Sequence, residues 1–473
     1  MFSHIDWPHI NWAKALAWLV LGPISLALLL YMWLLAANAR DRRPSDAARV
    51  MEQILRSVPS VPDAQNGYIF VMGFDVARNG DPRALGVRRI AWARHLAAHP
   101  EEPERPTLPS DRDDFKLGRS DAVNRLSETC HNVTPQCVQA LTQAGDTAHD
   151  WLESDQWLRD RYGELIAHPD WAVNVPFTTR TRLPPYRLVL DGQTAFLAKA
   201  WELAATGDAH AVRDLLNADA HFWRGVLARS EILITKMIAV SALNRHFAWA
   251  NLALRRLPSH AVKDAVPQEW MIPFTDEERS LRLALAGEWA FSDHVTRDLL
   301  EQPVGPGITD PAEAGALPRI AWRLARPALQ PQDSSNRLAK LMLAVLKALD
   351  APYRNYPDVL QQVRALERDA SDEHPAFSRP FNLIGDTMLA WGEGTFGNYA
   401  VRVADLEGIR RLALLTTDLR SRAVDAAQVP KALADSELRN PYTDKPFNWS
   451  EKESATVFTG LEHGERRRHA FPY

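Results

Sequence analysis

The hydrophobic positions of this chain begin with one unbroken apolar run near the amino terminus. Residues 15–37 read ALAWLVLGPISLALLLYMWLLAA and contain no charged side chain. At a rise of 1.5 Å per residue, a helix of this length crosses the hydrocarbon layer of a bilayer, which is about 30 Å thick. The run is too long for the core of a signal peptide, and no basic segment precedes it. The sequence therefore predicts an uncleaved membrane-spanning helix.

After this run, apolar residues recur mainly at the three- and four-residue spacing of amphipathic helices. In residues 146–168, for example, Trp151, Leu158 and Leu165 lie at helical spacing. Thr275 and Glu278 have the spacing of a capping box, which marks the first turn of a helix. The pattern predicts a large domain built from many helices.

Two segments depart from the helical pattern. Residues 66–76, NGYIFVMGFDV, form a short continuous apolar run that we interpret as a strand or extended segment. Near the carboxyl end, Pro441 and Pro446 exclude a helix, and apolar residues flank a polar turn at residues 450–454. That arrangement predicts a β-hairpin.

These patterns predict a mainly α fold: one N-terminal transmembrane helix, an α-helical multi-helix domain and a small C-terminal β-hairpin. The predicted parts are a transmembrane anchor with its flanks (1–43), an N-terminal helical subdomain with one extended segment (44–98), a polar linker loop (99–118), the main α-helical domain (119–430) and a C-terminal hairpin and tail (431–473). The linker is assigned because its prolines and charged side chains make residues 99–114 too polar to bury.

Composition and motifs exclude several classes of function. The chain is 46% hydrophobic and 24% charged, and its 55 basic and 59 acidic residues leave a net charge of −4. A nucleic-acid-binding protein needs a basic face to neutralise phosphates, so we expect no nucleic-acid partner. The sequence has no GxSxG, GxxxxGK[ST], GxGxxG or HExxH motif. It therefore indicates no cofactor and no metal site.

The only two cysteines, Cys130 and Cys137, lie at a corner between two predicted helices. Their six-residue gap does not fit the CxxC spacing of redox or haem sites, and a structural zinc site would need four ligands. The spacing favours a disulfide over two free thiols or a metal site. A disulfide in turn favours an oxidising compartment.

The orientation of the chain in the membrane has opposing signals. Arg40, Arg42 and Arg43 follow the apolar run, whereas only Lys14 precedes it. The positive-inside rule would keep the large domain in the cytoplasm, although long domains can cross the membrane despite that bias. Because of the cysteine pair, we predict a single-pass protein of the bacterial inner membrane, inserted through residues 15–37, with a periplasmic domain. A cytoplasm-facing domain stays the alternative.

Lys236 is the strongest candidate for chemistry, because it is the only charged residue between Ile232 and Leu243. A lysine on an apolar helix either reaches outward or is buried and paired, with a lowered pKa. A buried lysine could act as a general base or nucleophile. Glu202 is its candidate partner, and Glu288 is a second candidate carboxylate. A structural ion pair is the more common role of such a residue.

A second cluster of charges comprises Arg402, Asp405, Glu407, Arg410 and Arg411. Helical spacing predicts ion pairs between Arg402 and Asp405 and between Glu407 and Arg411. Such clusters commonly form ion networks. The functional alternative is an arginine-lined anion pocket, with Arg402, Asp405 and Arg410 as candidate binding residues.

Four segments carry a resemblance: NGYIFVMGFD (66–75), ITKMIAV (234–240), YAVRVADLEGIRRLALL (399–415) and NPYTDKPFNW (440–449). Together with the anchor, they resemble an uncharacterised family of bacterial membrane-anchored, mostly helical envelope proteins. The resemblance implies architecture and location but no activity. We therefore expect a scaffold or binding protein with a protein partner in a cell-envelope process. The alternative is a membrane-tethered hydrolase or transferase using Lys236 with nearby carboxylates, so the sequence leaves catalysis open.

Overall fold

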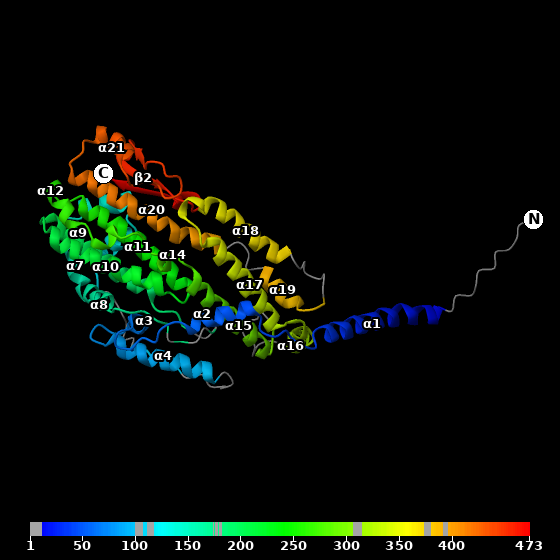
Figure 1. Ribbon diagram of the computed structural model, residues 1–473. Coiled ribbons are helices and arrows are strands. Elements are labelled where there is room, and N and C mark those ends of the chain that lie inside the picture. The colour runs from blue at the N-terminus through cyan, green and yellow to red at the C-terminus, as the bar shows by residue number, and fades with distance from the viewer. Residues whose placement is uncertain are drawn as a thin grey trace, which may run out of the picture. The chain divides into compact units, whose positions relative to one another are not determined.

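The computed structural model is mainly α-helical, with an N-terminal apolar helix and a small C-terminal sheet, which confirms the predicted fold class (Figure 1). It describes residues 12–99, 107–110, 118–173, 175, 178, 182–305, 315–372, 380–390 and 396–473. Most of the predicted linker 99–118 lies outside these ranges.

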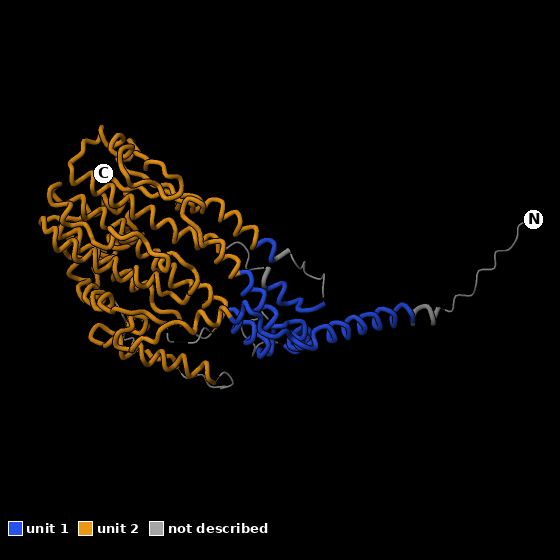
Figure 2. The backbone as a smooth tube through the Cα atoms, in the orientation of Figure 1, with its two compact units in different colours: residues 1–49, 292–341, 367–393 blue, residues 50–291, 342–366, 394–473 orange. Residues whose placement is uncertain are grey.

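The chain divides into two compact units (Figure 2). Unit 1 comprises residues 1–49, 292–341 and 367–393, and unit 2 comprises residues 50–291, 342–366 and 394–473. These units follow contacts in space, whereas the five predicted parts follow the sequence. The five-part division therefore stays a prediction.

Unit 1 begins with helix α1 (Trp12–Ala37). Its segment Trp18–Ala37 is long and apolar enough to cross a membrane. No residue of its most apolar stretch is buried, and the exposed fraction of the side chains reaches 77% at Trp18 and 68% at Leu29. The predicted apolar helix is therefore confirmed by its length and composition.

The carboxyl end of α1 is fastened to the rest of unit 1 by amide and carboxylate groups. Asn38 accepts a hydrogen bond from the Asn382 N–H (2.8 Å), and its own carbonyl accepts one from Gln330 Nε2 (3.0 Å). Asp41 accepts hydrogen bonds from the N–H groups of Gln332 (2.7 Å) and Asp333 (3.1 Å). These N–H groups lie in the first turn of α17 (Pro331–Leu349), where a carboxylate satisfies donors that have no partner within the helix.

The core of unit 2 is built around α11 (Leu233–Leu254), which packs against α9 (Tyr186–Ala205), α10 (Ala209–Arg229) and α20 (Phe396–Ser421). Most residues of α11 are buried, as expected for a helix whose apolar residues are distributed around its whole circumference. The other α-helices are α2 (Asp46–Arg56), α3 (Gly67–Met72), α4 (Pro82–Ala98), α5 (Asp121–Thr129), α6 (Pro135–Gln143), α7 (Asp146–Ser154), α8 (Gln156–Ile166), α12 (Ser259–Val262), α13 (Gln268–Met271), α14 (Asp276–Arg279), α15 (Arg282–Glu301), α16 (Ala316–Ala325), α18 (Tyr356–Asp372), α19 (Leu383–Ala390) and α21 (Val429–Asp435).

The predicted extended segment at residues 66–76 is wrong, because Gly67–Met72 forms the short helix α3. Asn66 caps this helix by accepting a hydrogen bond from the Tyr68 N–H (3.0 Å). All six residues of α3 are buried. A helix buried on every side has no polar face, so its sequence cannot be told from a buried strand by periodicity.

The C-terminal sheet is antiparallel, with β2 (Ala455–Thr459) between β1 (Asn448–Ser450) and β3 (Arg468–Pro472). The β1–β2 pair confirms the predicted hairpin, and β3 extends it. The sheet packs on α20, where Phe458 lies so close to Gly408 that a Cβ atom there would be 2.1 Å from its ring. Glycine at position 408 therefore permits this close approach.

Cys130 and Cys137 form a disulfide, as the spacing predicted, with their sulfur atoms 2.16 Å apart. Cys130 follows the last residue of α5, and Cys137 lies in the first turn of α6. Thr134 caps α6 by accepting a hydrogen bond from the Cys137 N–H (3.2 Å), and Pro135 begins the helix. The helix–turn–helix corner thus brings the two cysteines together.

Candidate functional site

Lys236 lies in the first turns of α11 and is buried, with 1% of its surface exposed. Its Nζ donates hydrogen bonds to the carbonyl oxygens of Leu227 (2.7 Å) and Glu278 (3.1 Å). Burial lowers the pKa of Lys236 to about 7, and the nearby Glu278 carboxylate partly opposes that shift. The amine is therefore held by backbone carbonyls that end α10 and α14.

The predicted pairing of Lys236 with Glu202 is wrong. Glu202 lies near the carboxyl end of α9, where it pairs with Lys199 and with His149 (3.3 Å). Arg256, just beyond α11, reaches the carbonyl of the neighbouring Trp201 (3.3 Å). Because α9 and α11 run in the same direction, Glu202 lies beside the carboxyl end of α11. Lys236 lies at the amino end of that helix, so the two side chains are far apart.

Glu288, the second candidate carboxylate, lies against the start of α11. Its Oε1 accepts a hydrogen bond from the Leu233 N–H (3.2 Å) at the first residue of α11. Burial raises the pKa of Glu288, and that hydrogen bond partly opposes the shift. A carboxylate at a helix amino terminus satisfies a free N–H and interacts favourably with the helix dipole. Glu288 therefore caps α11.

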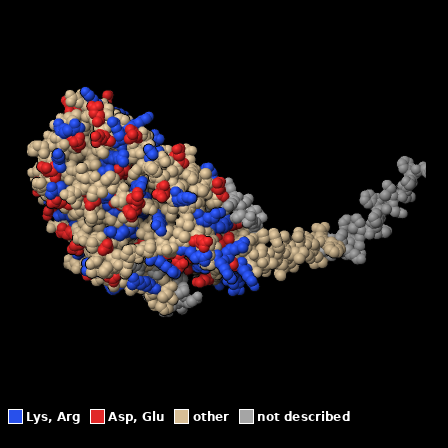
Figure 3. All heavy atoms as spheres, viewed as in Figure 1, with Lys and Arg blue, Asp and Glu red and all other residues tan. Residues whose placement is uncertain are grey.

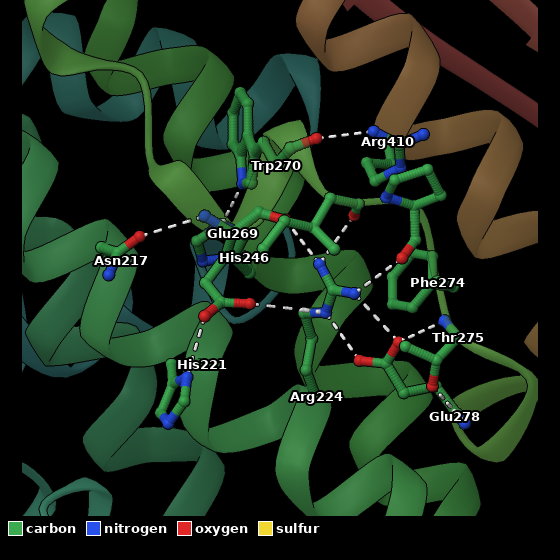
Figure 4. A network of polar contacts seen from close by, with 12 residues as sticks. Asn217, His221, Arg224, His246, Glu269, Trp270, Phe274, Thr275, Glu278 and Arg410 are labelled. Carbon is green, nitrogen blue, oxygen red and sulfur yellow. Dashed lines mark hydrogen bonds and ion pairs between the residues drawn. The ribbon is translucent and has the colours of Figure 1, made fainter.

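Arg224 of α10 is at the centre of a buried ion network that the sequence analysis did not identify (Figure 4). Its guanidinium binds Glu278 through two hydrogen bonds (2.6 and 2.9 Å). The remaining donors bind the carbonyls of Glu269, Ile272 (2.9 Å) and Pro273 (3.0 Å). The predicted capping box of Thr275 and Glu278 is confirmed. Arg224 therefore joins α10 to the segment between α13 and α14.

His246 and Asp219 form a second buried network, with both side chains fully buried. His246 Nδ1 lies 2.8 Å from an Asp219 carboxylate oxygen, and the Trp270 indole N–H donates to His246 Nε2 (2.8 Å). The tyrosine hydroxyl of Tyr162 also binds Asp219. An aspartate–histidine pair is the arrangement of a general base, but here the imidazole lone pair is already occupied. The pair is therefore suited to structure rather than proton transfer.

The structure does not gather Arg402, Asp405 and Arg410 into one site, although all three lie on α20. Asp405 accepts hydrogen bonds from the Tyr442 hydroxyl (2.6 Å) and from the N–H groups of Leu461 (3.0 Å) and Glu462 (3.3 Å). Burial raises the pKa of Asp405 to about 6, partly opposed by these hydrogen bonds. The predicted Arg402–Asp405 pair is therefore wrong, because Asp405 holds the segment after β2.

Arg410 instead binds Glu407 (2.7 Å) and the backbone carbonyl of Trp270 (2.6 Å), the residue whose indole contacts His246. The predicted Glu407–Arg411 pair is confirmed at 2.7 Å. Burial alone would raise the pKa of Glu407, but hydrogen bonds from the two arginines outweigh it, and the pKa is lowered. Glu407 is thus held as an anion between two cations.

Arg402 lines an open pocket of about 450 Å³ on unit 2. Its Nε donates to Glu462 (2.9 Å), and Arg364 contacts His463 Nε2 (2.8 Å) beside the pocket. The lining residues are Asn398, Val401, Arg402, Leu461, Glu462, His463, Glu465 and Arg466. The pocket presents basic and acidic side chains, which would suit a ligand with both positive and negative groups. Glu462, His463 and Arg466 were not predicted as site residues; their signal in the sequence is the charged tail EHGERRR.

No group of three or more His, Cys, Asp or Glu side chains could hold a metal ion within the described ranges. No protein-family model matches the chain, and neither does any curated protein or solved structure compared with it. Function must therefore be argued from the geometry of the chain itself.

Proposed function

We propose that this chain is a binding protein of the bacterial cell envelope, anchored in the inner membrane by α1, with its helical domain in the periplasm. The exposed apolar segment Trp18–Ala37 carries this proposal. A helix that is apolar all round and largely exposed presents a surface whose contact with water is unfavourable and whose contact with lipid tails is favourable. The Cys130–Cys137 disulfide supports the periplasmic side, because such bonds persist in oxidising compartments.

Binding suits the polar groups of unit 2 better than catalysis. Lys236 and His246 are buried, and their nitrogen atoms already have partners. The pocket at Arg402, by contrast, is open and presents the charged side chains of Glu465 and Arg466. Its proposed occupant is a segment of an envelope protein that carries charges of both signs. Chemistry at Lys236 has less support, because the amine is buried and its two hydrogen-bond partners are backbone carbonyls of α10 and α14.

The proposed side of the membrane is tested with reporters fused after Tyr473. Alkaline phosphatase becomes active only outside the cytoplasm. Green fluorescent protein, by contrast, becomes fluorescent in the cytoplasm and stays dark when it is exported unfolded. We expect an active phosphatase fusion and a dark fluorescent fusion. The reverse pattern would establish the cytoplasm-facing alternative and overturn the periplasmic placement.

Binding at the pocket is tested with a photo-crosslinking amino acid at Glu465 in whole cells. We expect a discrete crosslinked protein that disappears when Arg402→Glu is added. The matched control places the same amino acid at Lys431, an exposed residue of α21 that does not line the pocket. Equal crosslinking at both positions, or none at Glu465, would contradict binding in the pocket.

A further inference from the structure

Helix α16 of unit 1 presents an apolar face that no part of the described protein covers. Leu317, Ile320 and Leu324 are exposed by 79%, 52% and 51%, and their spacing places them on one side of the helix. The opposite side holds the helix in place, because Trp322 is buried and its indole N–H donates to the Gln302 carbonyl (3.0 Å). The apolar face is thus fixed in its outward position.

These three side chains stand out within unit 1. Among its described residues, every other large hydrophobic side chain that is exposed lies on α1. Scattered exposed hydrophobic residues are ordinary, but a row of three on a fixed helix marks an interaction surface. Whatever covers α1 is therefore the first candidate to cover α16.

Direct contacts place α16 beside the apolar segment of α1 (Figure 1). The Tyr31 hydroxyl donates to the Leu324 carbonyl (3.3 Å), and the turn Arg326–Ala328 after α16 packs against α1. Tyr31 lies six residues before Ala37, the last residue of α1, which corresponds to about 9 Å along the helix. The end of α16 therefore lies level with the spanning segment rather than beyond it.

Basic side chains accompany this apolar row. Arg319 and Arg323 lie one turn apart on α16, Arg326 follows its last residue, and Arg323 and Arg326 are exposed. Arg40 and Arg42 follow the end of α1 nearby in the chain, and Figure 3 shows Lys and Arg gathered where α1 joins the rest of unit 1. Arginine pairs well with phosphate oxygens, so this charge complements anionic lipid headgroups.

We propose that α16 is a second membrane element, which lies in the bilayer interface with Leu317, Ile320 and Leu324 among the acyl chains and Arg323 and Arg326 at lipid phosphates. This inference rests on the proposed insertion of α1. A single spanning helix leaves a domain free to turn about it, whereas a second, interfacial contact fixes unit 1 relative to the membrane surface.

The test uses the full chain in vesicles of phosphatidylethanolamine and phosphatidylglycerol, with one spin label on Leu317→Cys, Leu26→Cys or Glu451→Cys. The two native cysteines are bonded and buried, so they do not react with the label. Collisions with oxygen report lipid, and collisions with a water-soluble nickel chelate report water. We expect the labels at positions 317 and 26 to favour oxygen at least several-fold more than the label at exposed position 451. Adding Arg323→Glu should increase nickel collisions at position 317.

The outcomes separate this inference from the proposed anchoring. A label in lipid at position 26 but in water at position 317 would overturn the role of α16 and leave the anchor intact. A label in water at position 26 would overturn the anchor itself. If position 317 is shielded from both reagents and crosslinks to a second copy of the chain, a protein interface covers α16 and the inference fails. An unchanged signal with Arg323→Glu would overturn the contact with lipid phosphate.

Discussion

Two buried basic side chains of unit 2, Arg224 and Lys236, have different kinds of partner. Arg224 binds the Glu278 carboxylate with two nitrogens and three carbonyls with its other donors. Among the described residues, the hydrogen-bond partners of Lys236 are the carbonyls of Leu227 and Glu278. A guanidinium offers five donors in a fixed plane, whereas an ammonium is a compact point charge. No other side chain can therefore bind all the partners of Arg224. The charge of Lys236, by contrast, depends on pH near neutrality.

Arg224→Lys should destabilise the protein by roughly 3 kcal/mol. Lysine cannot reach the carboxylate and the three carbonyls together, so buried acceptors lose their partners. The measurement is the free energy of unfolding in detergent micelles. Arg213→Lys is the matched control on the same helix, since Arg213 is half-exposed and pairs only with the exposed Asp214 (3.1 Å). Equal stabilities for the two variants would contradict a structural role of the Arg224 network.

Lys236→Met should flatten the dependence of stability on pH above neutrality. The pKa of Lys236 is about 7 in the folded protein, against 10.5 for an ordinary lysine. Between these values the unfolded chain binds more protons, so the stability of the native protein rises with pH and is lost as pH falls toward 7. Relative to the variant, the unfolding free energy of the unmodified protein should rise by about 1 kcal/mol per pH unit from pH 7 to 9. Parallel curves would show that Lys236 does not titrate there.

At the scale of elements, the contact between α20 and the C-terminal sheet depends on glycine. A Cβ atom at Gly408 would meet the Phe458 ring at 2.1 Å, and Phe458 is fully buried in β2. Gly408→Ala should therefore cost about 1–3 kcal/mol through overpacking. Gly163→Ala in α8 is the control, because no atom lies within 4 Å of its added Cβ and alanine favours a helix. Heat denaturation should give a lower midpoint for the first variant only; equal midpoints would contradict the tight contact.

Elements with local signals could be predicted from the sequence. Thr134 with Pro135, and Thr275 with Glu278, begin helices because a cap and its partner lie within one turn. The β1–β2 hairpin was predictable for the same reason, since its turn and flanking apolar residues are adjacent in the chain. The helix α3 was not, because complete burial removes the polar face on which periodicity depends.

The candidate site was less predictable, because its partners come from distant segments. Helical spacing suggested Arg402 as the partner of Asp405, but the partners of Asp405 are Tyr442 and the N–H groups after β2. Arg402 pairs with Glu462, sixty residues away. Side chains three residues apart on a helix are neighbours, yet a buried carboxylate takes the donors that packing brings to it. Lys236 shows the same limit, since the sequence left open whether it is buried and suggested Glu202 as its partner, whereas it is buried and bound by the carbonyls of Leu227 and Glu278.

At the scale of the whole molecule, the residues after α1 bear on the side of the membrane. Arg42 lies over the Phe381 ring (5.0 Å) and 4.0 Å from Asp333, and the Arg43 carbonyl accepts a hydrogen bond from Asn336 (2.9 Å). This segment therefore has structural roles in unit 1. A charge that packs against its own domain is weaker evidence for orientation than a free one, so Arg42 opposes the periplasmic placement less than its charge alone suggests.

The redox state of the cysteine pair in growing cells tests this placement without any fusion. Cys130 and Cys137 are both fully buried, so cells must be quenched in acid and the chain unfolded before alkylation with a bulky maleimide. In a periplasmic domain we expect no alkylation unless a reductant is added first, and full alkylation in cells that lack their periplasmic thiol oxidase. Cells treated with dithiothreitol provide the reduced reference. The double variant Cys130→Ser, Cys137→Ser should still fold, with a loss of about 2–3 kcal/mol, because so short a closed loop restricts the unfolded chain only moderately. Two alkylated thiols in untreated cells would contradict the periplasmic placement, and the arginines after α1 would then explain the orientation.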